Sequence, residues 1–143
     1  MFLDASAVIA ILSEEKDAAI LRARLDAART PFTVSPLSVF EMVTGLARKK
    51  AAGDARHSAE LLRRAQVVVA AFLQDLGARE IDVTPDIGRA AQKAAMRYGK
   101  VTGHRADLNF GDCFAYACAR TEGVPLLFTG DDFSRTDVNE AFV

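Results

Sequence analysis

Short apolar segments alternate along the chain with longer stretches in which apolar residues recur every three or four positions. The short segments have the length of buried strands, and the periodic stretches have the spacing of amphipathic helices. The predicted strands cover residues 1–4, 32–35, 80–84 and 125–129, with a possible further strand over 136–142. Strands separated by helices are typical of a parallel sheet with right-handed crossovers. The pattern therefore predicts an α/β sandwich.

The predicted helices begin and end at residues that favour those positions. Pro36 and Pro85 lie where a first helical turn is expected, and Gly123 follows the last periodic residue of its stretch. The predicted helices cover residues 5–12, 14–29, 36–51, 54–76, 85–98 and 111–122. Residues 67–69 are all valine and would also suit a strand, but the longer apolar period around them favours a helix. Residues 100–110 are predicted to form a loop.

Length and composition predict one folded domain over residues 1–143. Half of the residues are hydrophobic and 26% are charged, which argues against a disordered chain. The chain starts without the basic segment of a signal peptide, and its longest strongly apolar run, residues 67–73, is far shorter than the ~20 residues of a membrane span. Its two cysteines, Cys113 and Cys118, have a helical spacing that points them apart. We therefore expect a cytoplasmic protein without disulfides or membrane attachment.

The formal net charge of −1 conceals an uneven distribution of charge. Residues 48–64 carry a local charge of +4 and residues 89–105 carry +5, so the rest of the chain is strongly acidic. The overall charge gives no sign of a nucleic-acid partner. The two basic segments are nevertheless compatible with a nucleic-acid partner.

Four acidic residues occupy positions that a parallel sheet would bring together. Asp4 ends the first predicted strand, and Asp131 follows the strand over 125–129. Asp112 lies at the start of a helix, and Glu41 lies about one turn into another. Ligands of open parallel sheets bind at the carboxyl ends of the strands. The four carboxylates are therefore expected to converge at that edge.

Converging carboxylates repel one another and need a compensating charge. Two unit charges ~4 Å apart cost about 1 kcal/mol in water and about 4 kcal/mol at an effective dielectric of 20. A set of oxygen ligands without histidine or cysteine suits a hard cation such as Mg²⁺ or Mn²⁺. Such a cation activates water for phosphodiester cleavage. Each acid taken alone also suits a helix cap or a turn, so this interpretation depends on the whole set.

Four blocks of the sequence resemble the PIN-domain nucleases and, within them, the VapC-type toxins of bacterial toxin–antitoxin pairs. The blocks read FLDASAVIAIL, SPLSVFEMVTGLARK, LNFGDCFAYACAR and PLLFTGDDFSRTDV. They follow the family's order over essentially the whole chain. The resemblance implies a PIN-like α/β/α sandwich with a short central parallel sheet of four to five strands. It also implies a Mg²⁺-dependent endoribonuclease that cleaves single-stranded or loop RNA, forms a homodimer and is inhibited by a cognate antitoxin.

The resemblance gives each acid a role. Asp4 and Asp112 match the principal metal ligands, and Glu41 matches the third acid. Asp131 matches the fourth acid, which helps to hold a metal or its water. Residues 129–133 are more compact than the T-x-D-x-x-F pattern of many PIN domains, so Asp132 is an alternative to Asp131.

Three further residues match positions that support such a site. Ser6 matches the hydroxyl of the D-x-S/T start, and Thr129 matches the hydroxyl before the fourth acid. Asn109, shortly before Asp112, fits the N-x-G-D block and would orient the loop there; a plain turn residue is the alternative.

Basic residues before the last long helix are candidates for binding RNA. Several share one helical stripe, which usually means a solvated face, but an acidic cleavage site needs positive charge nearby to attract phosphate. These candidates are Arg89, Lys93, Arg97, Lys100, His104 and Arg105. The runs 48–50 and 63–64 are further candidates, either for RNA or for an acidic antitoxin segment. The apolar faces of the helices over 36–51 and 54–76 would dock the antitoxin or belong to the core.

Three other functions are compatible with parts of the pattern. The chain could be a solitary PIN-domain nuclease in RNA processing, or a PIN domain that binds RNA or a partner without cleaving. A haloacid-dehalogenase-like phosphatase also begins with an aspartate at a strand end, but it needs a second aspartate where this chain has Ser6. Neither phosphate-binding glycine motif of nucleotide-binding folds occurs.

Overall fold

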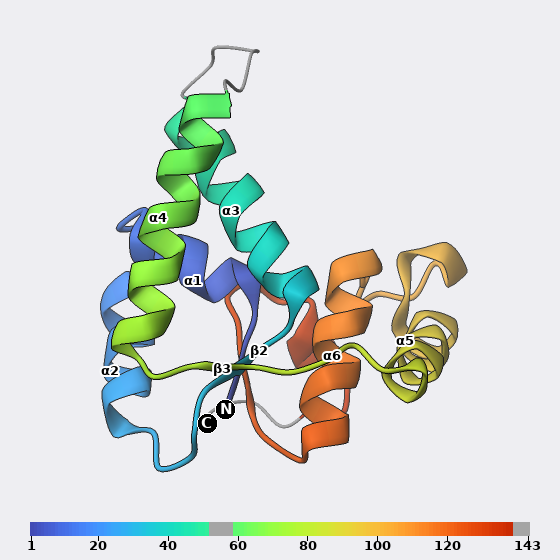
Figure 1. Cartoon of the computed structure of the whole chain (residues 1–143). Helices are drawn as coiled ribbons and strands as arrows, with labels where there is room; N and C mark the ends of the chain where they lie inside the picture. The colour runs from blue at the N-terminus through green and yellow to red at the C-terminus, as the bar shows by residue number, and fades with distance from the viewer. Residues whose placement is uncertain (52–58, 139–143) are drawn as a thin grey trace.

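The computed structural model describes residues 1–51 and 59–138, which form a parallel sheet with helices on both sides (Figure 1). The sheet has four strands in the order β3-β2-β1-β4. The strands are β1 (Phe2–Leu3), β2 (Thr33–Val34), β3 (Arg79–Glu80) and β4 (Leu126–Leu127). Phe2 pairs with Thr33 on one side and with Leu126 on the other. The predicted α/β class with a short parallel sheet is confirmed.

Helices link the strands in the predicted order. The helices are α1 (Ala5–Leu12), α2 (Ala18–Ala27), α3 (Pro36–Lys50), α4 (Ala59–Asp75), α5 (Pro85–Tyr98) and α6 (Phe110–Glu122), with short 3₁₀ turns η1 (Lys100–Thr102) and η2 (Phe133–Arg135). The starts of α3 and α5 follow from their caps, because Ser35 and Thr84 each accept a hydrogen bond from a backbone N–H in the first turn. The predicted start of α4 at residue 54 lies outside the described residues.

The sheet separates two apolar cores. Successive strand residues point to opposite faces, so Phe2 and Leu126 pack with α5 and α6, whereas Leu3 and Leu127 pack with α1 to α4. All four side chains are fully buried. β1 and β4 are continuous apolar runs because both faces of the sheet are covered there.

Three predicted segments differ from the structure. The third strand lies at Arg79–Glu80 rather than over 80–84, because Thr84 and Pro85 already begin α5 and the chain leaves the sheet soon after Ile81 donates to the carbonyl of Val34. The predicted loop over 100–110 contains η1 and an isolated parallel bridge between Gly99 and Leu108. Of the possible strand over 136–142, residues 136–138 are not extended into the sheet, and the remainder lies outside the described residues.

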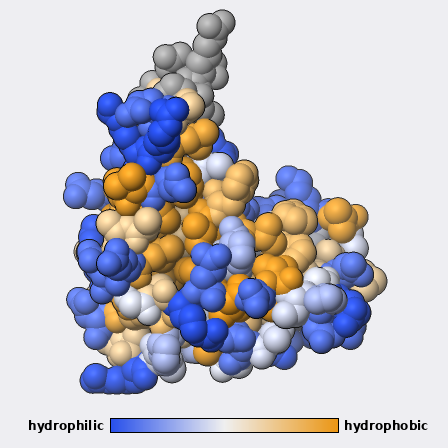
Figure 2. All heavy atoms as spheres, in the orientation of Figure 1, coloured by the Kyte–Doolittle hydropathy of each residue, from blue (hydrophilic) through white to orange (hydrophobic). Residues whose placement is uncertain are grey.

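The paired helices α3 and α4 extend away from the sheet as an arm (Figure 1). Figure 2 shows apolar side chains gathered over the middle of this arm, with hydrophilic ones toward its far end. The exposed apolar residues of the arm include Phe40, Val67 and Val68, although Met42 and Leu46 are buried beneath. The two helix faces predicted for the core or a partner are therefore buried in part and exposed in part. Within residues 1–51 and 59–138, no helix is long and apolar enough to cross a membrane.

Candidate active site

Three of the four predicted acids lie around one hollow of about 370 Å³, which we call the carboxylate hollow. Asp4 follows β1 and caps α1, Glu41 lies on α3, and Asp112 lies in the first turn of α6. Ser6 and Asn109 also line the hollow. The carboxyl edge of the sheet therefore collects these acids as the sequence predicts.

Asp4 is the most deeply buried acid of the hollow, with only 4% of its surface exposed. As N-cap of α1, its Oδ2 accepts hydrogen bonds from the backbone N–H of Ser6, at 2.9 Å, and from the Ser6 hydroxyl. Burial raises the pKa of Asp4, and these hydrogen bonds oppose the rise. The hydroxyl of Ser6 also accepts the backbone N–H of Thr129 at 3.2 Å, which ties the end of β4 to Asp4.

Asp112 is oriented by a reciprocal capping box with Asn109. The Asn109 backbone N–H donates to Oδ2 of Asp112 at 2.8 Å, and the Asp112 backbone N–H donates to the Asn109 side chain at 3.1 Å. Burial raises the pKa of Asp112 to about 6, with contributions from the charges of Asp4, Asp132 and Asp107. Asn109, which the sequence predicts to orient this loop, is therefore the N-cap of α6.

Glu41 packs its carboxylate directly against a glycine of the neighbouring helix. A Cβ added to Gly111 would fall far inside the van der Waals radii of both Glu41 carboxylate oxygens. Burial and the charges of Asp4 and Asp112 raise the pKa of Glu41 to about 7. Gly111 is not among the residues predicted from the sequence; a glycine within a helical turn, next to a candidate acid, is the signal that could have identified it.

The structure places Asp131 outside the carboxylate hollow. The chain turns at Gly130, whose φ is 91°, and the Asp131 side chain is 83% exposed, 3.9 Å from Arg135. Asp131 lines a different hollow together with Asp17 and Thr129, whose hydroxyl donates to Asp17 at 3.2 Å. Asp132 acts on the site more directly, because its charge is one of those that raise the pKa of Asp112.

Most of the basic residues predicted to bind RNA have partners within the chain. Arg89 pairs with Asp86, Arg97 with Asp137, and Lys100 with Asp107. The Nδ1 atom of His104 accepts the backbone N–H of Ala106, and the carbonyl of Arg105 accepts a hydrogen bond from Arg135. Lys93 has no ion-pair partner within the described residues. Three residues of the stripe are therefore paired with acids of this chain, and the acid that pairs with Arg97 is 40 residues away.

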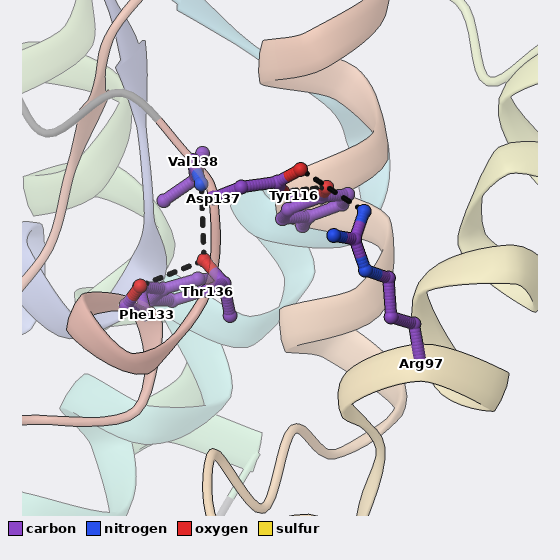
Figure 3. A network of polar contacts seen from close by, with 6 residues as sticks. All are labelled: Arg97, Tyr116, Phe133, Thr136, Asp137 and Val138. Atoms are coloured by element: carbon purple, nitrogen blue, oxygen red, sulfur yellow. Dashed lines mark hydrogen bonds and ion pairs between the residues drawn. The ribbon is translucent and has the colours of Figure 1, made fainter.

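Figure 3 shows Asp137 between Tyr116 of α6 and Arg97 of α5. The Tyr116 hydroxyl donates to one carboxylate oxygen of Asp137, and Arg97 donates to the other at 3.0 Å. The hydrogen bond from Tyr116 is the main cause that holds the pKa of Asp137 below its usual range. This contact fastens the segment after η2 to the two helices.

Two other cations lie closer to the acids. Arg48 and Lys49, from the last turn of α3, line the carboxylate hollow, and Lys49 pairs with Glu15. Among the described residues, no three His, Cys, Asp or Glu side chains already form a group that could hold a metal ion. The hollow presents an oxygen-only donor set in which Asp4 accepts hydrogen bonds from Ser6 and Asp112 accepts one from Asn109.

Comparison with known proteins gives close relatives over the full length. A family model of the PIN domain matches residues 1–139. A VapC ribonuclease of Rhizobium meliloti is 44% identical over 140 residues, covering 96% of this chain and 98% of that protein. Ribonuclease VapC42 of Mycobacterium tuberculosis is 36% identical over 142 residues, covering 99% and 98%.

Solved structures share the fold at lower identity. Mycobacterium tuberculosis VapC20, described as a toxin that cleaves the sarcin–ricin loop, has a TM-score of 0.72 and 20% identity, covering 97% of this chain and 96% of its own. A chain of a toxin–antitoxin complex from Klebsiella pneumoniae has a TM-score of 0.62 and 17% identity, covering 93% and 89%. The family match, the relatives and the shared fold agree: the chain belongs to the PIN domain family and, within it, to the VapC ribonucleases.

Proposed function

We propose that this ribonuclease cleaves single-stranded or loop RNA at the carboxylate hollow, with Asp4, Glu41 and Asp112 holding a divalent cation. The observation that carries the proposal is the approach of three carboxylates from β1, α3 and α6 to one hollow, where burial raises all three pKa values and neighbouring acids raise those of Glu41 and Asp112 further. A hard cation would relieve that repulsion. We propose Mg²⁺, with Mn²⁺ as an alternative.

The residues of the hollow suit such a cation, and each would have a different role. A bound divalent cation would lower the pKa of a water molecule and stabilise charge on the phosphate. A hydrogen bond from Ser6 orients the carboxylate of Asp4, and one from Asn109 orients the carboxylate of Asp112. Both acids are therefore already oriented before a ligand binds. Without the cation, the pKa of Glu41 is about 7, so this acid would have to give up its proton to bind the metal. Hydrolysis by attack of water would leave a 5′-phosphate and a 3′-hydroxyl.

The fourth acid has two candidates. The family pattern favours Asp131, and Thr129 beside it would support the position. The charge of Asp132 on Asp112 favours Asp132. Comparing the Asp131→Asn and Asp132→Asn variants distinguishes them, since only the acid that serves the site should lower cleavage strongly when neutralised.

We propose a toxin that works as one domain over residues 1–143 and is inhibited by a cognate antitoxin. The Klebsiella neighbour comes from a toxin–antitoxin complex, which supports such a partner. A groove of about 540 Å³ between α3 and α4, lined in part by Val39, Phe40, Val43 and Leu62, is an apolar surface that an antitoxin could cover. A homodimer and a cytoplasmic location complete the proposal; both cysteines are free and buried, as a reducing compartment would leave them.

The Asp4→Asn variant tests the proposed site. Asparagine is also a good helix N-cap, so α1 should form as before. We expect loss of Mg²⁺-dependent RNA cleavage by about 10²-fold or more, the loss typical for removing one key electrostatic group, together with loss of growth inhibition. Asp86→Asn is the matched control, because Asp86 is exposed on α5 and outside the hollow. Full cleavage by Asp4→Asn would contradict the proposal.

The same preparations separate the alternatives. A phosphatase would release phosphate from small phosphomonoesters, which the proposed nuclease should leave intact. A PIN domain that only binds RNA would show no cleavage in the wild-type protein. A solitary processing nuclease would cleave RNA without inhibiting growth and without a cognate antitoxin.

A further inference from the structure

Arg48 shares one face of α3 with Glu41. The two residues are seven positions apart, two helical turns, and both line the carboxylate hollow. Thr44 and Gly45 lie between them on the same face and also line it. A guanidinium therefore stands beside the hollow at the outer end of the row that begins with Glu41.

The part of α3 that carries this row packs closely against α1, the helix that Asp4 caps. A Cβ on Gly45 would overlap the end of the Ile9 side chain, so α1 and α3 cross at close range here. Asp4 is the cap of α1, and Glu41 and Arg48 project from α3. The close crossing fixes the backbone of Arg48 relative to both acids, and leaves the exposed side chain free to reorient.

Arg48 has no ion pair or side-chain hydrogen bond in the part of the chain that the structure describes. Its neighbour Lys49 is engaged by Glu15, and Arg97 of the predicted basic stripe is engaged by Asp137. Arg48 itself is exposed and lines the carboxylate hollow. Its charge is available to a ligand.

An RNA strand that reaches the carboxylate hollow needs such a charge. Carboxylates repel phosphate, and favourable binding of a nucleic acid comes largely from lysine and arginine contacts to its phosphates. The planar guanidinium of arginine can donate two parallel hydrogen bonds to a phosphate. Arg48 combines this chemistry with a place at the rim of the hollow.

We propose that Arg48 binds a backbone phosphate of the RNA next to the cleaved bond and so positions the strand over the carboxylates. The inference rests on the proposed function, because it takes the carboxylate hollow as the place of cleavage. It moves the principal RNA contact from the α5 stripe to the last turn of α3. Arg48 is thus a positioning residue, and the chemical step remains with the acids.

Binding of a fluorescent, single-stranded RNA of mixed sequence tests this proposal in the Asp4→Asn background, which prevents cleavage during the measurement. Arg48→Ala should weaken binding about tenfold, as expected for a charge-assisted hydrogen-bonded contact. The slope of log affinity against log salt should fall in magnitude by about 0.7, the value for one phosphate contact to a single strand. Arg48→Glu should weaken binding further, and Arg48→Lys should retain part of it.

Arg29→Ala is the matched control, because it removes the same charge from an exposed position that lines none of the described hollows. In the Asp4-containing enzyme, Arg48→Ala should raise KM more than it lowers kcat. RNA binding by Arg48→Ala equal to that of Arg29→Ala would overturn the proposal, as would loss of antitoxin binding with RNA binding unchanged. Cleavage by the Asp4→Asn variant would instead refute the proposed site, whatever Arg48 does.

Discussion

At the scale of single residues, local sequence predicts the three acids of the hollow together with Ser6 and Asn109, but it does not predict the close contact at Gly111. Asp4 and Asp112 are helix-capping or first-turn residues, positions that short patterns predict. Gly111 contacts Glu41 because α3 and α6 approach each other there, and that approach is set by packing between distant segments. Sequence periodicity places a residue on a helix face, but it does not say which helix faces it.

The requirement for glycine at position 111 gives a prediction. Gly111→Ala should displace the Glu41 carboxylate and lower RNA cleavage by about tenfold or more, since misplacing a site group by about 1 Å can cost 10²-fold. Gly88→Ala is the control, because nothing lies within 4 Å of its added Cβ; this helical substitution should stabilise α5 by about 0.5–1 kcal/mol. Cleavage rates and urea unfolding measure both effects.

A second change separates crowding from other causes. Glu41→Asp shortens the side chain and withdraws the carboxylate from position 111. The double variant Gly111→Ala, Glu41→Asp should therefore be more stable to urea than Gly111→Ala alone. If Gly111→Ala cleaves RNA like the wild-type protein, the close contact with Glu41 does not constrain the site.

At the scale of elements, the sequence predicts helices better than strands or side-chain partners. Apart from the start of α4, caps and apolar periods define the helix ends within a few residues, whereas β3 is short, exposed and displaced from its predicted range. The stripe on α5 is a correct helical pattern, but Arg97 pairs with Asp137, 40 residues away. Local spacing contains no information about such a distant partner.

That distant contact should stabilise the segment after η2. Asp137→Ala leaves the hydroxyl of the largely buried Tyr116 without its acceptor and should cost about 1–3 kcal/mol in free energy of unfolding. Tyr116→Phe removes the donor together with the penalty for burying it without an acceptor, so it should lower the free energy of unfolding less than Asp137→Ala does. Urea unfolding measures both, with the exposed Asp26→Ala as control. Equal stability of Asp137→Ala and Asp26→Ala would show that the contact adds nothing to the fold.

At the scale of the whole molecule, a net charge of −1 is compatible with a nuclease because the charges are segregated. Part of the negative charge is collected in the carboxylate hollow, where burial makes it costly. The fold therefore holds an arrangement that is unfavourable when all its acids are ionised. Protons or a cation can relieve it, and the two compete.

This competition gives a pH dependence with a defined sign. The folded-state pKa values of Glu41 and Asp112, about 7 and about 6, lie above their ordinary values, so the folded protein binds these protons more tightly than the unfolded chain does. Their contribution to stability is full in acid, below the unfolded values, and is lost as pH rises through 6 and 7. In EDTA, the Tm should therefore fall across this range, and less so in Glu41→Gln, which cannot ionise.

At the proposed site, Mg²⁺ should reverse that trend, because it would bind the ionised carboxylates and compete with their protons. The rise in Tm on adding Mg²⁺ should be larger above pH 7 than below pH 6, and Glu41→Gln should reduce it most at the higher pH. Asp86→Asn, which changes an exposed acid, controls for general effects of salt and charge. Carboxylates bind Mg²⁺ more weakly below their pKa values, because the cation must first displace their protons. A Mg²⁺-induced rise in Tm that is independent of pH would therefore show that the cation does not bind at these carboxylates.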